Sequence, residues 1–151
     1  MMANPALDIP NLLYLYAELI DSARFDEAAA LFDQARIVAN GHEIRGREAI
    51  AGMWSQWIKL YECGTPRTRH IITNPIIHLA DDGQSATCRS QWTVLQSAPG
   101  FPLQVVATGR YHDRFALIEG AWAFTERDYA RTDLAGDSSA HTLRPLIETG
   151  R

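Results

Sequence analysis

The spacing of apolar residues changes near Arg67, and this change constrains the fold more than any single motif. Before Arg67, apolar residues recur every three or four positions in three stretches, at about residues 10–20, 25–32 and 47–61. After it, apolar and polar residues alternate in runs separated by turn residues such as Asp82-Gly83 and Glu119-Gly120. Helices followed by strands, rather than alternating with them, are typical of an α+β domain with an antiparallel sheet.

Four long strands are expected in the second half, over residues 68–79, 85–96, 103–117 and 121–129, and a short one over 36–39. Short turns between successive strands make them antiparallel. Because the three helices are available to cover one face, we expect a bent sheet that partly wraps a helical layer. The length predicts one domain over residues 1–151, with a core at about 10–131 and a loosely ordered tail at 132–151.

Composition excludes several classes of function. The net charge of −4 argues against a nucleic-acid surface, because phosphate binding needs clustered Lys and Arg. Cys63 and Cys88 form no CxxC pair, which favours a reducing, cytoplasmic location. No apolar run approaches the roughly 18 residues of a membrane span, and the N-terminus does not have the pattern of a signal peptide. Without a glycine-rich phosphate loop or a metal-ligand spacing, we expect neither a cofactor nor a metal.

The residues that carry chemistry are Tyr16, Asp21 and His70. If the fold brings Asp21 to His70, the carboxylate holds one ring nitrogen and leaves the other to move a proton. Tyr16 is then the best donor for a developing oxyanion. A structural interpretation competes with this one. In it, Asp21 caps a helix that begins near Arg24, and His70 binds a backbone carbonyl group.

Asn74 and the first two tryptophans are weaker candidates for substrate binding. Strand alternation places Asn74 on the same face as His70, where it either orients a substrate or marks a strand irregularity before Pro75. Trp54 and Trp57 lie at helical spacing, which indicates core packing or the wall of a pocket.

Arg127 has two interpretations as well. A guanidinium group matches the geometry of a carboxylate, so Arg127 either meets an anionic substrate or forms a salt bridge with Asp113 or Glu126.

Three stretches together with the order of elements resemble the SnoaL-like branch of the nuclear transport factor 2-like superfamily. They are residues 16–26, 67–74 and 109–127. The resemblance implies a cone-shaped, cystatin-like domain whose curved sheet and helices enclose an apolar pocket, often in a homodimer formed through the sheet.

Within that superfamily the chain is similar to scytalone dehydratase and related dehydratases. The similarity implies that His70 and Asp21 form a dyad that removes a proton beside a leaving group, with Tyr16 in support. We therefore expect a cofactor-independent lyase, dehydratase or isomerase that acts on a hydrophobic cyclic or polyketide-like small molecule. The alternative is a non-catalytic ligand-binding protein, or an accessory subunit resembling the small subunit of aromatic-ring dioxygenases.

Overall fold

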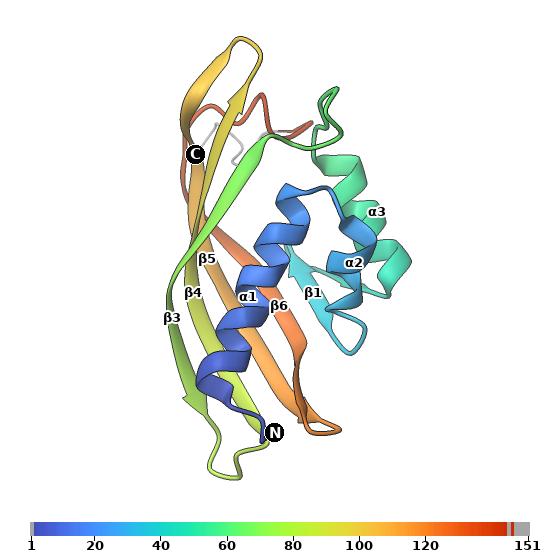
Figure 1. Cartoon of the computed structure of the whole chain (residues 1–151), viewed down its shortest axis with the longest axis vertical. Helices are drawn as coiled ribbons and strands as arrows, with labels where there is room; N and C mark the ends of the chain where they lie inside the picture. The colour runs from blue at the N-terminus through green and yellow to red at the C-terminus, as the bar shows by residue number, and fades with distance from the viewer. Residues whose placement is uncertain (1, 145, 147–151) are drawn as a thin grey trace.

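The computed structural model describes residues 2–144 and 146, and it contains three helices and six strands within them (Figure 1). In chain order these are α1 (Pro5–Asp21), α2 (Phe25–Ala30), β1 (Arg36–Ala39), β2 (His42–Arg45), α3 (Arg47–Trp57), β3 (Thr68–Leu79), β4 (Ser85–Ala98), β5 (Phe101–Ile118) and β6 (Ala121–Ala135). The α+β class and the four long strands that the sequence predicts are confirmed.

The strands form one curved sheet in the order β2-β1-β6-β5-β4-β3. Each of β3, β4 and β5 pairs antiparallel with the next strand along the chain, as short turns require. The short strand β1 pairs parallel with β6. A parallel pair needs a long connection, and α3 and the meander between the two strands provide it. This order leaves β3 and β2 as the edges of the sheet.

The helices cover the concave side of the sheet (Figure 1). One face of α1 is buried, and it packs against β3 and β6. The fully buried apolar side chains of the core come from both layers and include Ile9, Leu13, Phe32, Phe115 and Phe124. This arrangement directs the inward face of β3 toward the C-terminal half of α1.

Helix α1 and strand β2 differ from the predictions. Helix α1 begins at Pro5 rather than near residue 10, because Asn4 caps it by accepting a hydrogen bond from the Ala6 backbone N–H at 3.1 Å. Pro10 lies inside the helix instead of starting it. Strand β2 was not predicted, because its polar sequence on an exposed edge carries no alternating signal.

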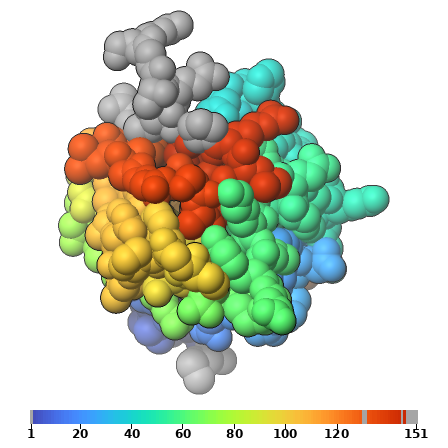
Figure 2. Space-filling view, turned by 90° about the horizontal axis from the view of Figure 1, so that it is seen from above, coloured from blue at the N-terminus to red at the C-terminus, as the bar shows by residue number. Residues whose placement is uncertain are grey.

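The prediction of a loosely ordered tail is wrong for residues 132–144. Strand β6 continues to Ala135, and residues 138–143 form a segment, here called the C-terminal strap, that lies across the end of α3. The Leu143 N–H donates to the Trp57 carbonyl, and the Lys59 N–H donates to the His141 carbonyl, each at 2.9 Å. Figure 2 looks down on this end, where the strap (red) lies against the segment that follows α3 (green). Residues 145 and 147–151 of the predicted tail lie outside the described residues.

None of the described helices is long and apolar enough to cross a bilayer.

Candidate active site

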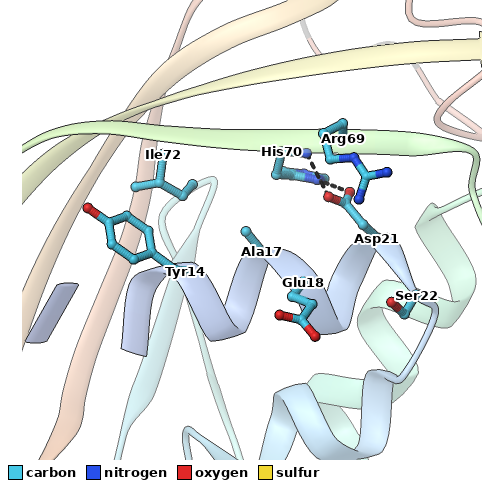
Figure 3. Close-up of a pocket in the computed structure, with 8 residues that line it drawn as sticks. All are labelled: Tyr14, Ala17, Glu18, Asp21, Ser22, Arg69, His70 and Ile72. Carbon is cyan, nitrogen blue, oxygen red and sulfur yellow. Dashed lines mark hydrogen bonds and ion pairs between the residues drawn. The ribbon is translucent and has the colours of Figure 1, made fainter. Parts of the chain in front are cut away.

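Asp21 and His70 are in direct contact, although 49 positions separate them in the sequence. The Oδ1 atom of Asp21 lies 2.6 Å from Nδ1 of His70, and Oδ2 accepts a hydrogen bond from the His70 backbone N–H at 2.7 Å (Figure 3). The Thr68 hydroxyl also donates to Oδ1, at 2.8 Å. The contact that the acid–base hypothesis requires is therefore present.

The ends of two elements create this contact. Asp21 is the last residue of α1, and His70 is the third residue of the edge strand β3. A carboxylate at a helix C-terminus is disfavoured by the helix dipole, so it needs compensating donors. The outward-facing N–H of an edge strand has no neighbouring strand to bind. Asp21 satisfies that N–H, and it does not cap α2, whose N-cap Arg24 has no side-chain cap bond.

The donors around Asp21 keep it ionised. Burial acts to raise the pKa of Asp21, but the hydrogen bonds and charge of His70, together with Thr68, outweigh burial and lower that pKa below its usual value. An ionised carboxylate only accepts hydrogen bonds, so the proton of the Nδ1–Oδ1 bond belongs to His70 Nδ1. In the neutral ring, Nε2 then carries the lone pair, and His70 is oriented to act as a base through that atom.

An open groove runs beside the dyad, between α1 and β3. Its volume is about 460 Å³. Its lining mixes apolar and polar side chains: Tyr14, Ala17, Glu18, Asp21, Ser22, Arg69, His70 and Ile72 (Figure 3). The cavity at the dyad is thus a partly polar groove, whereas the family resemblance implies an enclosed apolar pocket.

The C-terminal strap places a second histidine near the dyad. The rings of His70 and His141 have their centroids 6.1 Å apart and are inclined at 67°. The His141 side chain is buried, and its Nδ1 atom has no hydrogen-bond partner among the described residues. Burial, with a smaller effect from the charge of His70, lowers the pKa of His141 to about 4, so its ring is neutral near pH 7. No sequence pattern points to His141, because it lies in a polar stretch with no ligand spacing.

Tyr16 belongs to a different buried cluster. Its hydroxyl forms a 2.6 Å hydrogen bond with the Tyr129 hydroxyl, and its ring lies 4.3 Å from the Arg127 guanidinium carbon. Burial raises the pKa of Tyr16 well above its usual value, so the phenol stays protonated. None of the hydrogen bonds of the described residues joins Tyr16 to Asp21 or His70.

Arg127 is fully buried at the centre of that cluster. Its Nε and Nη2 atoms each donate to the Asp113 carboxylate at 2.8 Å, which is the salt-bridge alternative for this residue. The Tyr111 ring lies 3.8 Å from the guanidinium carbon and contributes a cation–π contact. Arg127 Nη1 has no partner among the described residues, but the side chain is paired with Asp113 and fully buried, so it does not lie open to an anionic substrate.

The remaining sequence candidates lie away from the dyad. Asn74 is exposed at a β-bulge with a φ of 53°, and its side chain donates to Gln91, so it marks the strand irregularity. Trp54 is buried against Tyr16 in the core. Trp57 is half-buried and lines a second open groove along α3. Within the described part of the chain, no group of three or more His, Cys, Asp or Glu residues is arranged to hold a metal ion.

The sequence matches a family model. The model is described as a SnoaL-like domain, and it matches residues 3–128. The chain belongs to the SnoaL-like domain family. No curated protein matches the sequence.

Several solved structures share the fold. Rv3472, a protein of unknown function from Mycobacterium tuberculosis, is 24% identical with a TM-score of 0.70, over 85% of this chain and 71% of that one. A candidate scytalone dehydratase from Novosphingobium aromaticivorans is 23% identical with a TM-score of 0.66, over 86% and 85%. An NTF2-like protein with a cystatin-like fold from the same species is 18% identical with a TM-score of 0.65, over 80% and 77%. At these identities the structures show the fold alone, and they confirm the cystatin-like fold that the resemblance implies.

Proposed function

We propose that this SnoaL-like protein is a cofactor-independent acid–base enzyme in which His70, held by Asp21, removes a proton from a hydrophobic cyclic small molecule. The observation that carries the proposal is the 2.6 Å contact between Asp21 Oδ1 and His70 Nδ1. It fixes the ring and its tautomer, and it stabilises the imidazolium that forms when Nε2 takes a proton.

The surroundings of His70 support proton transfer rather than a purely structural role. The Asp21 carboxylate has a lowered pKa and three donors, so it remains a negative charge beside the ring. The His70 side chain is 8% exposed, and the residue lines the groove between α1 and β3. A base that is fixed, poorly hydrated and reachable from a groove meets the geometric needs of proton abstraction.

The product of the reaction depends on what lies beside the carbon that loses its proton. Loss of a neighbouring hydroxide makes the reaction a dehydration, and return of the proton to another carbon makes it an isomerisation. Both reactions need one base that can also return a proton, which a histidine near neutral pH supplies. Family membership is consistent with either outcome, because one fold carries many activities.

Binding without turnover is the second candidate function. The contacts of Tyr16 and Arg127 favour it, because Tyr16 is paired with Tyr129 and Arg127 with Asp113, so neither supplies His70 with a donor for a developing oxyanion. In that case His70 contributes a hydrogen bond to the ligand and moves no proton.

Proton exchange in D2O tests the proposal without knowledge of the natural substrate. Cyclic ketones and their β-hydroxy derivatives, such as 1-tetralone and 3-hydroxycyclohexanone, are incubated with the protein, and NMR follows both loss of the α-proton signal and loss of water. We expect catalysed exchange with at least one compound. His70→Gln should lower its rate by about a hundred- to ten-thousandfold, the usual contribution of a general base.

His78→Gln is the matched control, because His78 is exposed on the same strand. It should leave the exchange rate unchanged. Equal exchange by the wild type and His70→Gln would overturn the proposal. Binding of these ketones by the wild type with no exchange of any of them would favour the second candidate.

A further inference from the structure

Two buried polar atoms near the dyad have no hydrogen-bond partner among the described residues, and they lie on neighbouring parts of the structure. One is Nδ1 of His141, on the C-terminal strap, and the other is Oε1 of Gln96, on β4. The Gln96 Nε2 atom donates to the carbonyl of Ala140, the residue before His141, at 2.8 Å. Gln96 is 1% exposed and His141 is 5% exposed, so bulk water does not satisfy either atom.

The orientation of the Gln96 amide follows from its partners. Its nitrogen faces two carbonyl oxygens, of Pro66 at 3.0 Å and of Ala140 at 2.8 Å. Only the NH2 end can donate to both, so Oε1 is the atom left without a partner. A group that binds there must be a hydrogen-bond donor.

The two atoms lie beside the proposed base. Gln96 is opposite Thr68 in the register of β3 and β4, and Thr68 and His70 both bind Asp21. The His141 ring lies 6.1 Å from the His70 ring, with no direct hydrogen bond between the two rings.

We propose that His141 and Gln96 form a subsite that binds a hydroxyl group of the ligand, directly beside His70. The hydroxyl donates its proton to Gln96 Oε1 and accepts a hydrogen bond from Nδ1–H of His141. A neutral imidazole supplies that donor, and burial keeps the His141 ring neutral near pH 7. The inference rests on the proposed function for the role of His70, and it specifies that the ligand carries a hydroxyl near the reacting carbon.

An unsatisfied buried polar atom is destabilising, which is why such atoms in native structures indicate a missing partner. The competing occupant is an ordered water molecule with a purely structural role. The two differ in one respect: a ligand hydroxyl makes affinity depend on His141, whereas a structural water makes only stability depend on it.

A pair of ligands that differ in one group tests the subsite. Cyclohexanol and methylcyclohexane are nearly equal in size, and only the first has a hydroxyl. Each is titrated into the wild type and into His141→Phe, and NMR measures the dissociation constant. We expect His141→Phe to weaken cyclohexanol binding about three- to tenfold, the value of one neutral hydrogen bond, and to leave methylcyclohexane within about twofold.

His78→Phe is the control for the loss of a histidine, and it should change neither constant because His78 is exposed away from the strap. A second measurement uses the unaltered protein labelled with ¹⁵N-histidine. Cyclohexanol should shift the ring nitrogen signals of His141, and methylcyclohexane should not. This result does not depend on the folding of any variant.

Equal weakening of both ligands by His141→Phe, no weakening of either, or no shift of the His141 nitrogens with cyclohexanol would overturn the subsite. Failure of the proposed function is distinguishable from these outcomes. Hydroxyl-dependent binding through His141 without His70-dependent exchange refutes only the enzyme. His70-dependent exchange with no hydroxyl effect at His141 refutes only the subsite.

Discussion

Asp21→Asn separates the structural role of the dyad from its chemical role. Asp21 accepts three hydrogen bonds, from the Thr68 hydroxyl, the His70 backbone N–H and His70 Nδ1. In the variant, the amide oxygen can keep the backbone N–H while the new NH2 group replaces Oδ1. The Thr68 hydroxyl can rotate to accept from this NH2 group, and His70 Nδ1 can accept only if its proton moves to Nε2. The geometry then survives, but the tautomer reverses.

The cost in stability follows from the same three bonds. Hydrogen bonds to a charged group contribute about 1.5–3 kcal/mol, and neutral ones about 0.5–1.5 kcal/mol. Replacing three charge-assisted bonds by neutral ones lowers the free energy of unfolding by about 3 kcal/mol at pH 7. The effect on catalysis is larger, because Nε2 no longer carries a lone pair. The same change in Ser-His-Asp enzymes lowers kcat by about 10⁴.

The direction of the pKa shift gives the sign of the dependence of folding stability on pH. The folded-state pKa of Asp21 is lowered below its ordinary value of 3.8. The contribution of Asp21 to folding stability is therefore fully present above pH 3.8. The contribution is lost as the pH falls through the lowered folded-state pKa. The difference in stability between the wild type and Asp21→Asn should therefore shrink as the pH falls below 3.8.

Two measurements check this reasoning. Urea unfolding at neutral and acidic pH gives the free energies, with Glu18→Gln as the control because Glu18 is an exposed carboxylate on the same helix. Long-range ¹H–¹⁵N NMR gives the tautomer of His70: Nδ1–H in the wild type and Nε2–H in the variant. A variant that keeps Nδ1–H, or that matches Glu18→Gln in stability at pH 7, would refute the argument.

The remaining predictions concern the other buried groups. Arg127→Met should lower the free energy of unfolding by about 3–5 kcal/mol, because it leaves the Asp113 carboxylate buried without its partner; urea unfolding should show part of this recovered in Asp113→Leu/Arg127→Met. Tyr16→Phe should lower it by about 1–3 kcal/mol by leaving the Tyr129 hydroxyl unpaired, with no change in the pH profile of proton exchange. A changed profile would instead return Tyr16 to the catalytic group. Since burial and the nearby charge of His70 lower the folded-state pKa of His141 from 6.5 to about 4, its contribution to stability is present above pH 6.5 and is lost as the pH falls toward 4. Thermal unfolding of His141→Phe should lack that loss, and the same loss in the variant would refute the assignment.

The sequence predicted what depends on local patterns. The alternation of apolar and polar residues predicted β3 at its observed bounds, because every second side chain of a strand lies on the same face of the sheet. It failed for Asn74, where the bulge between Thr73 and Ile76 shifts the register and turns the side chain out of the series. A bulge is set by the pairing of two strands, and single-strand periodicity does not contain it.

The site was predicted only as far as the resemblance extended. The pairing of Asp21 with His70 came from residues that match the family, not from their spacing along the chain. Tyr16 was assigned to the same site because the resemblance implies that it supports proton transfer there. Five residues along a helix correspond to a turn of about 140°, so the two side chains leave α1 in different directions. His141 was missed because the strap that carries it is held by backbone hydrogen bonds, which do not depend on a recognisable side-chain pattern.

The two buried polar clusters differ in where they lie. In the Arg127 cluster, the guanidinium has a carboxylate partner and aromatic rings over its faces, and Tyr16 has Tyr129. Arg127 Nη1 has no partner among the described residues, but the cluster lies in the core, where it specifies how α1 packs on the sheet. Beside the dyad, Asp21 accepts three hydrogen bonds, whereas Gln96 Oε1 and His141 Nδ1 have no partner within the described residues. Evolution toward stability alone would remove these unpaired atoms, because an apolar side chain of the same shape costs less. His141→Phe should therefore unfold at an equal or higher temperature than the wild type near pH 7, while losing affinity for the hydroxyl-bearing ligand. A marked loss of stability without a loss of affinity would mean that His141 serves the strap rather than the site.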